Sequence, residues 1–464
     1  MTTQTITAAD LMTGPQYLSL HLLETFVAAL PVRDENGMAK ELVYGGDTRT
    51  MITSQAQNRA RRTWTRDRAN AGTGHMREHT MGLRTREWAK LTATALNTRH
   101  NWDTDHGEGK ALQTAKALLS GVGLKFGDKP NTIDLTKVLV YAPQNTAEVL
   151  AQFIVDQATE VTTWVDGWAA EKATADAAAE KKKTAAAAAR KAKKTGTPTE
   201  SPAASDDAED KETKLPPLPT SLRAGVLTAL APRDATDIAL YGRFLAEIAD
   251  SPNVDGAIQT GHAFTVTPAQ HIDDFYAAAD DAKLDRKAHA LDFLEAGDDS
   301  GAGMTGYQSL ITGTFYRHSA LDRYKLRANL LAAGMKPETV AQRATEAETE
   351  FIEAFVEAVP RAKKNSTAST GTLPKLVLAF EGDRPFNYAG VFEKSIDETD
   401  PEPSVTAATR LLDQHALVLR KRGGISEARV FTFDLDVQQL IDDRVLAGTL
   451  PGIEADSLEE LTGQ

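Results

Sequence analysis

The stretch from Leu30 to Arg68 constrains the fold more than any other, because it sets a basic helix directly after a short strand. Thr50–Ile52 are strand-like, and Thr53 and Ser54 supply an N-cap for the helix. At about 100° per residue, two stripes separate along that helix. The outward stripe is Gln55, Arg59, Arg62 and Arg66, and the stripe predicted to be buried is Ala56, Ala60 and Trp64. One face of the helix is therefore cationic and the other can enter a core.

The charge of this stretch is opposite to that of the whole chain. Between Arg49 and Arg68 there are six arginines and one acidic residue, Asp67, in a protein whose formal net charge is −13. Such a contrast indicates a localised site for a polyanion. Backbone N–H groups at the start of the helix would provide a phosphate-binding site. Gly45-Gly46, which have no Cβ, would allow another backbone to approach closely. Composition alone leaves an ordinary solvated helix face equally open.

The overall composition narrows the class of protein. The chain has 464 residues, of which 25% are charged and 41% hydrophobic, as in soluble globular proteins of one to three domains. It contains no Cys, which excludes disulfides, thiolate zinc sites and a cysteine nucleophile. No apolar run is long enough to span a bilayer, and the first ten residues lack a signal pattern. We therefore expect a cytoplasmic protein that does not contact a membrane.

The first half of the chain is predicted to contain a buried strand, the basic helix and a helical insertion. The strand is Tyr17–Phe26, and residues 76–165 have mainly helical spacing. The segment Glu171–Thr220 has low complexity: an Ala/Lys/Glu tract that permits a helix is followed by a Pro/Ser/Asp-rich linker. Its lysine clusters could touch nucleic acid loosely, but we favour a solvated insertion.

The second half is predicted to alternate strands and helices around a polar projecting arm at 268–306. The predicted strands are Ala257–Thr267, Gln308–His318, Lys375–Phe380 and Ala428–Leu435. The predicted helices are Asp237–Glu247 (a helix or turn), Pro337–Ala362 and Ser404–Arg422. Reduced to its core, the order is β-α-β-β-α-β, the ferredoxin-like split plan of an α+β protein with large insertions after the first helix and the second strand.

Five segments of this chain resemble one known family. The chain is similar to the repeated backbone subunit of the type I-E CRISPR Cascade surveillance complex, the CasC family. The segments keep the order of that family and are Arg33–Arg62, Asp237–Glu247, Asn253–Thr267, Gly313–Asp322 and Phe386–Ile396.

The resemblance implies a modified RNA-recognition (RRM) palm with helical fingers and a β-hairpin thumb. On this chain the palm would comprise 1–69, 221–267 and 307–464, the fingers 70–168, the low-complexity insertion 169–220 and the thumb 268–306. Copies would stack head to tail along one guide RNA through an interface that does not close. The thumb would displace a nucleotide at intervals, leaving the other bases to pair with invading DNA. Implied partners are the guide (CRISPR RNA), target DNA through the guide, other copies and other Cascade subunits, with no cofactor and no catalysis.

The resemblance also implies roles for individual residues. Contacts to phosphate or ribose, which position RNA without reading its sequence, fall on Arg33, Lys40, Arg49, Thr53, Ser54, Gln55 and Arg62. The RNA-binding set also includes Asn58, Arg59, Arg66, Arg243, Phe244, Thr265 and Thr267. Phe244 would be the apolar wedge beside the displaced nucleotide, the alternative being a core Phe next to Leu240 and Leu245. Thr265 and Thr267 would support the base of the thumb. Asn58 and Met51 depart from the basic residues common in the family.

Other chemistries have weaker sequence support. His75 and His79 have the i, i+4 spacing of half a metal site but lack the acidic partner of a zinc motif, so no metal is predicted. One alternative function is a metal-dependent ribonuclease on the same fold, because related backbone subunits of other CRISPR types cut RNA with a loop aspartate, here Asp34. A third is an acidic scaffold that binds another protein through the helical insertion.

Overall fold

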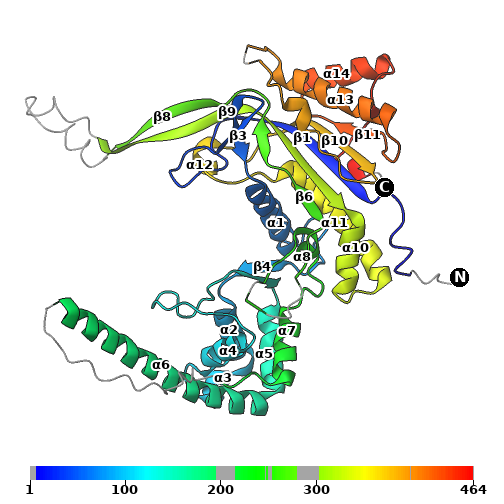
Figure 1. Cartoon of the computed structure of the whole chain (residues 1–464). Coiled ribbons are helices and arrows are strands. Elements are labelled where there is room, and N and C mark those ends of the chain that lie inside the picture. Colours follow the sequence, from blue (N-terminus) through cyan, green and yellow to red (C-terminus); the bar gives the residue numbers. More distant parts are fainter. Residues whose placement is uncertain are drawn as a thin grey trace, which may run out of the picture. The chain divides into compact units, whose positions relative to one another are not determined.

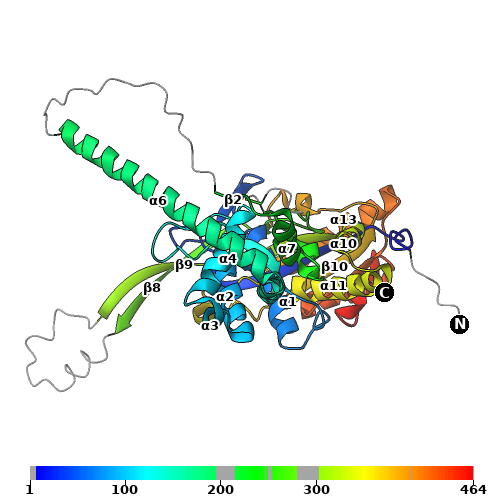
Figure 2. The ribbon, with the colours of Figure 1, turned by 90° about the horizontal axis from the view of Figure 1, so that it is seen from below.

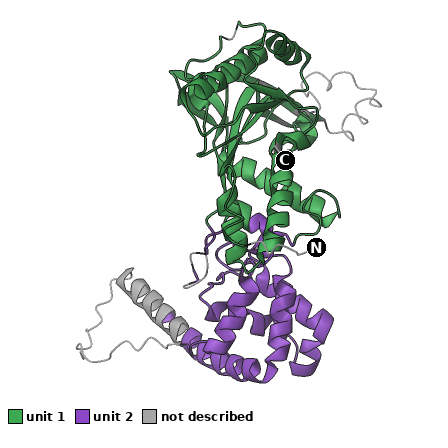
Figure 3. Ribbon diagram, turned by 90° about the vertical axis from the view of Figure 1, so that its right-hand side faces the viewer, with its two compact units in different colours: residues 1–79, 239–242, 255–464 green, residues 80–238, 243–254 purple. Residues whose placement is uncertain are grey.

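The apolar run that begins at Tyr17 forms the centre of a large sheet in the computed structural model, which describes residues 7–194, 215–245, 247–248, 253–279, 302–397 and 399–462. Helices and a mixed sheet share the chain, which confirms the predicted α+β class. The chain divides into two units, green and purple in Figure 3. Unit 1 comprises residues 1–79, 239–242 and 255–464, and unit 2 comprises 80–238 and 243–254.

Unit 1 contains the large sheet (Figure 1). Its strands are β1 (Tyr17–Ala29), β2 (Glu41–Tyr44), β3 (Asp47–Ile52), β6 (Ile258–Thr260), β7 (Ala263–Thr265), β8 (Gln270–Ala279), β9 (Ala302–Asp322), β10 (Pro374–Gly382), β11 (Ala428–Phe431) and β12 (Gly452–Glu454). The strand order is β12-β11-β10-β1-β9-β7-β3-β2, with β6 and β8 also paired to β9. All neighbouring strands are antiparallel except β11 and β12, which are parallel.

The central strand β1 is covered on both faces, so that its leucines and even its polar residues Ser19, His21 and Glu24 are buried. It pairs with β10 from Tyr17 opposite Gly382 and with β9 from Tyr17 opposite Asp322. The strand predicted at Tyr17–Phe26 is confirmed and extends to Ala29.

Helices cover both faces of this sheet. Those of unit 1 are α1 (Ser54–Asn70), α10 (Arg323–Ala332), α11 (Pro337–Glu357), α12 (Lys364–Thr367), α13 (Pro403–Lys421) and α14 (Leu435–Leu446), with the 3-10 turns η1 (Ala389–Phe392) and η2 (Glu459–Thr462). On one face, α1 and the end of α11 contact β9 through hydrogen bonds from Arg61 to Ser319 and from Arg317 to the Ala358 carbonyl. On the other face, α13 and α14 pack on Leu23, Leu378 and Phe380.

Two predictions for the palm strands need correction. The strand predicted at Ala257–Thr267 is two short strands, β6 and β7, separated by Gly261 and His262. The last predicted strand ends at Phe431 instead of Leu435, and a helix, α14, follows it. Asp434 caps that helix by accepting a hydrogen bond from the Val437 N–H at 3.0 Å.

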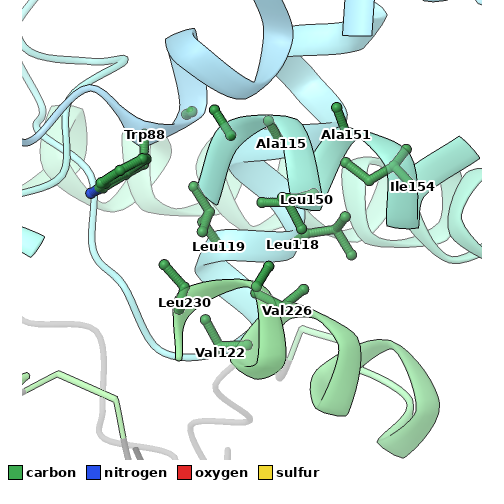
Figure 4. Packing of buried hydrophobic residues seen from close by; sticks show 14 of the residues in the cluster. Trp88, Ala115, Leu118, Leu119, Val122, Leu150, Ala151, Ile154, Val226 and Leu230 are labelled. Carbon is green, nitrogen blue, oxygen red and sulfur yellow. The ribbon is translucent and has the colours of Figure 1, made fainter. Parts of the chain in front are cut away.

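Unit 2 is mainly helical, as predicted. It contains α2 (Trp88–His100), α3 (Trp102–His106), α4 (Lys110–Gly121), α5 (Thr146–Asp156), α6 (Ala158–Lys194) and α7 (Thr220–Leu230), and α8 (Thr236–Tyr241) crosses its boundary. Figure 4 shows its core, where Leu118, Leu150 and Val226 from three different helices meet. A two-stranded antiparallel sheet, β4 (Gly82–Thr85) with β5 (Val140–Pro143), was not predicted.

The helix predicted to be possible in the Ala/Lys/Glu tract is present: α6 continues to Lys194. The linker that follows it lies outside the described residues up to 214. Among the helices that the structure describes, none combines the length and hydropathy that crossing a bilayer requires.

Candidate nucleic-acid interface

The glycine pair before the basic helix forms the turn of the β2–β3 hairpin. Gly45 and Gly46 have φ of 64° and 91°, the left-handed values that a two-residue hairpin turn favours. A Cβ on Gly45 would lie 1.5 Å from the Glu393 carbonyl oxygen, whereas one on Gly46 would meet nothing within 4 Å. The backbone that approaches Gly45 closely is therefore that of Glu393 in the same chain, whereas the space beside Gly46 is unoccupied.

Side chains of the protein already occupy part of the helix N-terminus. Thr53, the N-cap of α1, accepts a hydrogen bond from the Ala56 N–H at 3.3 Å. The Ser54 N–H donates to Nδ1 of His262 at 2.9 Å. Because Nδ1 accepts, the ring proton of a neutral His262 lies on Nε2. The phosphate-binding site predicted at this terminus therefore has fewer available N–H groups than the sequence suggested. His262 is a neighbour of the site that the sequence did not identify.

The outward stripe of α1 lies on the surface as predicted. Gln55 and Arg59 are exposed, and Arg62 and Arg66 are half-buried. Arg66 also contacts Asp67 at 3.1 Å. We call the three arginines of this stripe, together with the exposed Arg33 and the half-buried Lys40 of the loop before β2, the cationic strip.

The inward face of α1 differs from the prediction. Of the stripe Ala56, Ala60 and Trp64, only Ala60 is buried, and the buried face is Gln57, Ala60, Arg61, Thr65 and Ala69. The guanidinium of Arg61 lies 5.3 Å from the Phe355 ring centroid, and burial lowers its pKa to about 9. A residue that the sequence pattern places in solvent is thus part of the core.

Arg49, Thr265 and Thr267 belong to the scaffold, in place of the RNA contacts predicted for them. All three side chains are buried. Arg49 donates to the backbone carbonyls of Thr265 at 2.8 Å and Phe392 at 3.3 Å, and burial lowers its pKa. The guanidinium holds β3, β7 and η1 together, and the Thr265 hydroxyl accepts from the Thr50 N–H. A buried guanidinium in these bonds has no surface to offer a phosphate.

Two more predicted contacts also have structural partners. The Asn58 side-chain carbonyl accepts a hydrogen bond from the Thr260 hydroxyl at 2.9 Å, which ties α1 to β6. Arg243 is buried, and it donates to the carbonyl oxygens of Tyr141 and Leu230 within unit 2. Burial, followed by the charge of Arg233, lowers the Arg243 pKa to about 10. Arg243 therefore braces unit 2 from inside, in place of the predicted RNA contact. Asn58 is half-buried, and its RNA contact stays a prediction.

Phe244 points outward, unlike the arginine before it. Its side chain is 75% exposed, whereas Leu240 and Leu245 are buried. The alternative of a core phenylalanine is therefore excluded. A large exposed aromatic ring is available to stack on a flat partner.

A long two-stranded arm carries further exposed aromatic rings that the sequence analysis did not name. The paired strands β8 and β9 extend from the sheet in both Figure 1 and Figure 2, and residues 280–301 lie outside the described residues. Phe275 and Tyr307 are opposite each other, with ring centroids 5.3 Å apart, and Tyr307 is 79% exposed. Tyr276 covers Gly306 on the other face. The available sequence signal was the presence of aromatic residues, Phe275, Tyr276 and Tyr307, within and beside an otherwise polar arm.

Most of the chain matches the model of one protein family. The family model Cas_CT1975, described as "CT1975-like protein", matches residues 18–447. The chain belongs to the CT1975-like protein family. No curated protein matches it.

Two solved structures share the fold of this CT1975-like protein. The first, titled "CRISPR RNA-guided surveillance complex, pre-nicking", is 24% identical with a TM-score of 0.68. The second, titled "CRISPR RNA-guided surveillance complex", is 21% identical with a TM-score of 0.59. Each comparison covers 96% of this chain and 98% of the other. The likeness extends over both units.

Asp34, the residue of the ribonuclease alternative, braces its own loop in this CT1975-like protein. Its carboxylate accepts hydrogen bonds from the backbone N–H groups of Asn36 at 2.8 Å and Met38 at 2.9 Å. The bond from Met38 is the main reason that the pKa of Asp34 is lowered, which makes the carboxylate a weaker base. Among the described residues, Asp34 is in no group of side chains that could hold a metal ion.

Proposed function

We propose that this CT1975-like protein is a non-catalytic backbone subunit of a type I-E Cascade surveillance complex, in which several copies bind one guide RNA without reading its sequence. The observation that carries the proposal is the fold shared over nearly the whole chain with two proteins whose titles name RNA-guided surveillance complexes. The type I-E assignment rests on the five sequence segments that resemble the CasC family. Target DNA would be bound indirectly, by pairing with the guide.

The sheet of unit 1 supports an RRM-like palm. Strands β1, β7, β9 and β10 lie in the order β10-β1-β9-β7, each antiparallel to its neighbours. Helix α1 precedes β7 and helix α11 precedes β10, so the chain order is β-α-β-β-α-β. This is the ferredoxin-like plan, and the β8–β9 arm, as the thumb, extends from its third strand.

The cationic strip would hold the guide through its phosphates. Its five side chains lie on the loop 33–40 and on the outward face of α1, and all are exposed or half-buried. The hydroxyl and amide groups of Thr53, Ser54 and Gln55 lie at the start of the same helix. Phe244 would stack beside the displaced nucleotide, and the exposed rings of the thumb would stack on bases. Phosphate contacts and stacking both tolerate any sequence, as a guide carrier requires.

Co-expression with guides of unrelated sequence tests the function. We expect the purified complex to contain the guide and several copies of the chain, to bind the different guides about equally, and to cut neither RNA nor DNA with Mg²⁺. The affinity should fall linearly in log–log form as salt is raised, with a slope of about 0.9 or less per phosphate contact. A complex without nucleic acid would indicate the protein-scaffold alternative. Cleavage that Asp34→Ala abolishes would establish the ribonuclease.

Reversing the charge of the helix face should abolish assembly on the guide. In the variant Arg59→Glu/Arg62→Glu/Arg66→Glu, three cations that face phosphates become anions that repel them. We expect the guide affinity to fall by about two orders of magnitude or more and the salt slope to lose about 0.7 per contact removed. The matched control reverses three exposed basic residues near and on α13, Lys394, Arg420 and Lys421. Equal losses in both variants would show only a general charge effect.

Removing the aromatic wedge should weaken guide binding without unfolding the protein. Phe244→Ala deletes an exposed ring, so we expect little change in stability and a loss of about 1–3 kcal/mol in guide binding for each site where the ring stacks on a base. Phe244→Trp keeps a stacking surface and should bind within a few-fold of the wild type. Unchanged binding by the alanine variant would remove Phe244 from the interface.

A further inference from the structure

Outside the proposed RNA interface, three metal-ligating side chains converge in unit 1. His75 follows α1, Glu353 lies on α11 and Glu459 lies in η2 near the end of the chain. One ligand atom from each residue lies within 4.8 Å of the other two. The His75 Nε2 and the Glu353 Oε1 are already 2.9 Å apart. Three elements that are distant in sequence thus bring one imidazole and two carboxylates to one place.

The surroundings of this cluster contain more negative charge than positive charge. A fourth carboxylate, Glu350, is 1% exposed and accepts a hydrogen bond from the His75 N–H at 2.7 Å. Its other oxygen, Oε1, accepts no hydrogen bond from the described residues, and its nearest cation, Nη1 of Arg68, is 3.9 Å away. A second cation beside this buried carboxylate would offset its desolvation.

Arg68 is placed to orient a metal ligand. Its Nη1 contacts Oε2 of Glu353, leaving Oε1 for a metal, and its guanidinium lies 4.2 Å from the centroid of the Trp64 ring, which keeps it in place. Ligating carboxylates commonly have such a partner on their second oxygen. Gly74 permits the arrangement, since a Cβ there would be 2.7 Å from a Glu350 oxygen and 3.1 Å from the Arg68 Nε.

We infer that His75, Glu353 and Glu459 form a binding site for a divalent transition-metal ion such as Zn²⁺, Mn²⁺ or Co²⁺. The ion would take the place of the proton that Nε2 of His75 now donates to Glu353, and the neutral ring would carry its proton on Nδ1. One nitrogen and two carboxylate oxygens suit these ions, whereas Mg²⁺ and Ca²⁺ prefer oxygen ligands alone. Glu350 would hold His75 in position beside the site through its hydrogen bond from the His75 N–H.

Such an ion would join η2 to α11 and to the segment that follows α1. Glu459 is contributed by η2, whereas Glu353 and His75 belong to α11 and to the segment after α1. The bound ion would therefore restrict opening of the C-terminal segment, and it would stabilise unit 1 without touching the cationic strip. The inference does not depend on the proposed RNA-binding function.

Titration of the tag-free full-length chain with each metal tests the site. We expect one Zn²⁺, Co²⁺ or Mn²⁺ per chain by calorimetry and elemental analysis, a visible absorption band with Co²⁺, and no comparable binding of Mg²⁺. Glu459→Gln and His75→Ala should each weaken the affinity by about tenfold or more. Because Glu459 is exposed, its variant should fold normally, which keeps the test valid if the other variant is unstable.

A second histidine–glutamate pair in unit 1 supplies the matched control. His271 contacts Glu41, and among the described residues that pair has no third ligand nearby. His271→Ala should therefore leave metal binding unchanged. The inference fails if none of the three transition metals binds saturably, if Glu459→Gln and His75→Ala bind as tightly as the wild type, or if His271→Ala loses as much affinity as they do. Guide binding by Glu459→Gln should be the same as that of the wild type.

Discussion

Replacing Arg317 with Met will lower the free energy of unfolding of unit 1 by about 3–5 kcal/mol, because it leaves a carboxylate buried without its partner. Arg317 on β9 and Glu24 on β1 form an ion pair of 2.7 Å, and each side chain is 1% exposed. Arg317 also donates to the side-chain oxygen of Gln57 at 3.4 Å and to the Ala358 carbonyl at 3.3 Å. One guanidinium thus joins two central strands to α1 and to the end of α11.

A double replacement separates the missing partner from the loss of packing. Glu24→Leu/Arg317→Met removes both charges, so we expect it to recover most of the stability lost by Arg317→Met. Hydrogen–deuterium exchange of peptides from β1 and β9 measures the effect within unit 1, whereas a global melt would mix the two units. Amide protection in these strands that differs by less than about 1 kcal/mol between Arg317→Met and wild type would contradict the prediction.

The burial of Arg317 in this ion pair is a feature that the local sequence pattern did not predict. Alternating and helical patterns predicted β1, the outward stripe of α1 and most helices of unit 2, because each depends on the spacing of neighbouring residues. Arg49, Arg61 and Arg317 are buried for reasons that local spacing does not contain. Arg61 is covered by phenylalanines of α11, almost 300 residues away in the sequence, and Arg49 by backbone carbonyls of β7 and η1. A pattern that treats arginine as exposed therefore overestimated the cationic surface.

Short elements were the other source of error. The strands β4 and β5 have four residues each, too few for a period to appear, and they exist because they pair with each other across more than 50 residues. The resemblance led us to expect an arm near 268–306 and a role for Phe244. The structure shows the paired strands β8 and β9 there and an exposed Phe244 ring, while the thumb and wedge roles stay proposals. Which side of the arm each aromatic ring occupies depends on the register of β8 with β9, and only the structure provides it.

Acidification from about pH 6.5 to about pH 4 will destabilise unit 1 by several kcal/mol, because three histidines are buried in the neutral form. His21 on β1, His318 on β9 and His415 on α13 have almost no exposed surface. Burial lowers the pKa of His318 and of His415 to about 4, and that of His21 well below the usual value. The ring centroid of His21 lies 4.8 Å from that of His318, so protonating one disfavours protonating the other.

Proton uptake by the unfolded chain determines whether the free energy of unfolding rises or falls with pH. Well above the ordinary histidine pKa of about 6.5, these rings are neutral in both the folded and the unfolded state and contribute almost no pH dependence. Below the ordinary histidine value of about 6.5 the unfolded chain binds protons that the folded chain does not, so the free energy of unfolding falls with pH. Each histidine contributes up to about 1.4 kcal/mol per pH unit, which gives about 3 kcal/mol for His318 and for His415 by pH 4.

The slope of stability against pH distinguishes this mechanism from general acid damage. For unit 1 it is measured by hydrogen–deuterium exchange of β1 and β9 peptides in increasing denaturant at a series of pH values. His415→Phe removes one of the three titrations, and the new ring would lie against Phe380, whose centroid is 4.3 Å from that of His415. The variant loses the hydrogen bond between His415 and the Tyr388 hydroxyl at every pH, which lowers the whole curve, but its slope between pH 6 and pH 5 should fall by about one proton. His106→Gln, at an exposed histidine of unit 2, should leave the slope of unit 1 unchanged. Stability that is flat from pH 7 to pH 5 would show that the buried histidines titrate alike in the folded and unfolded states.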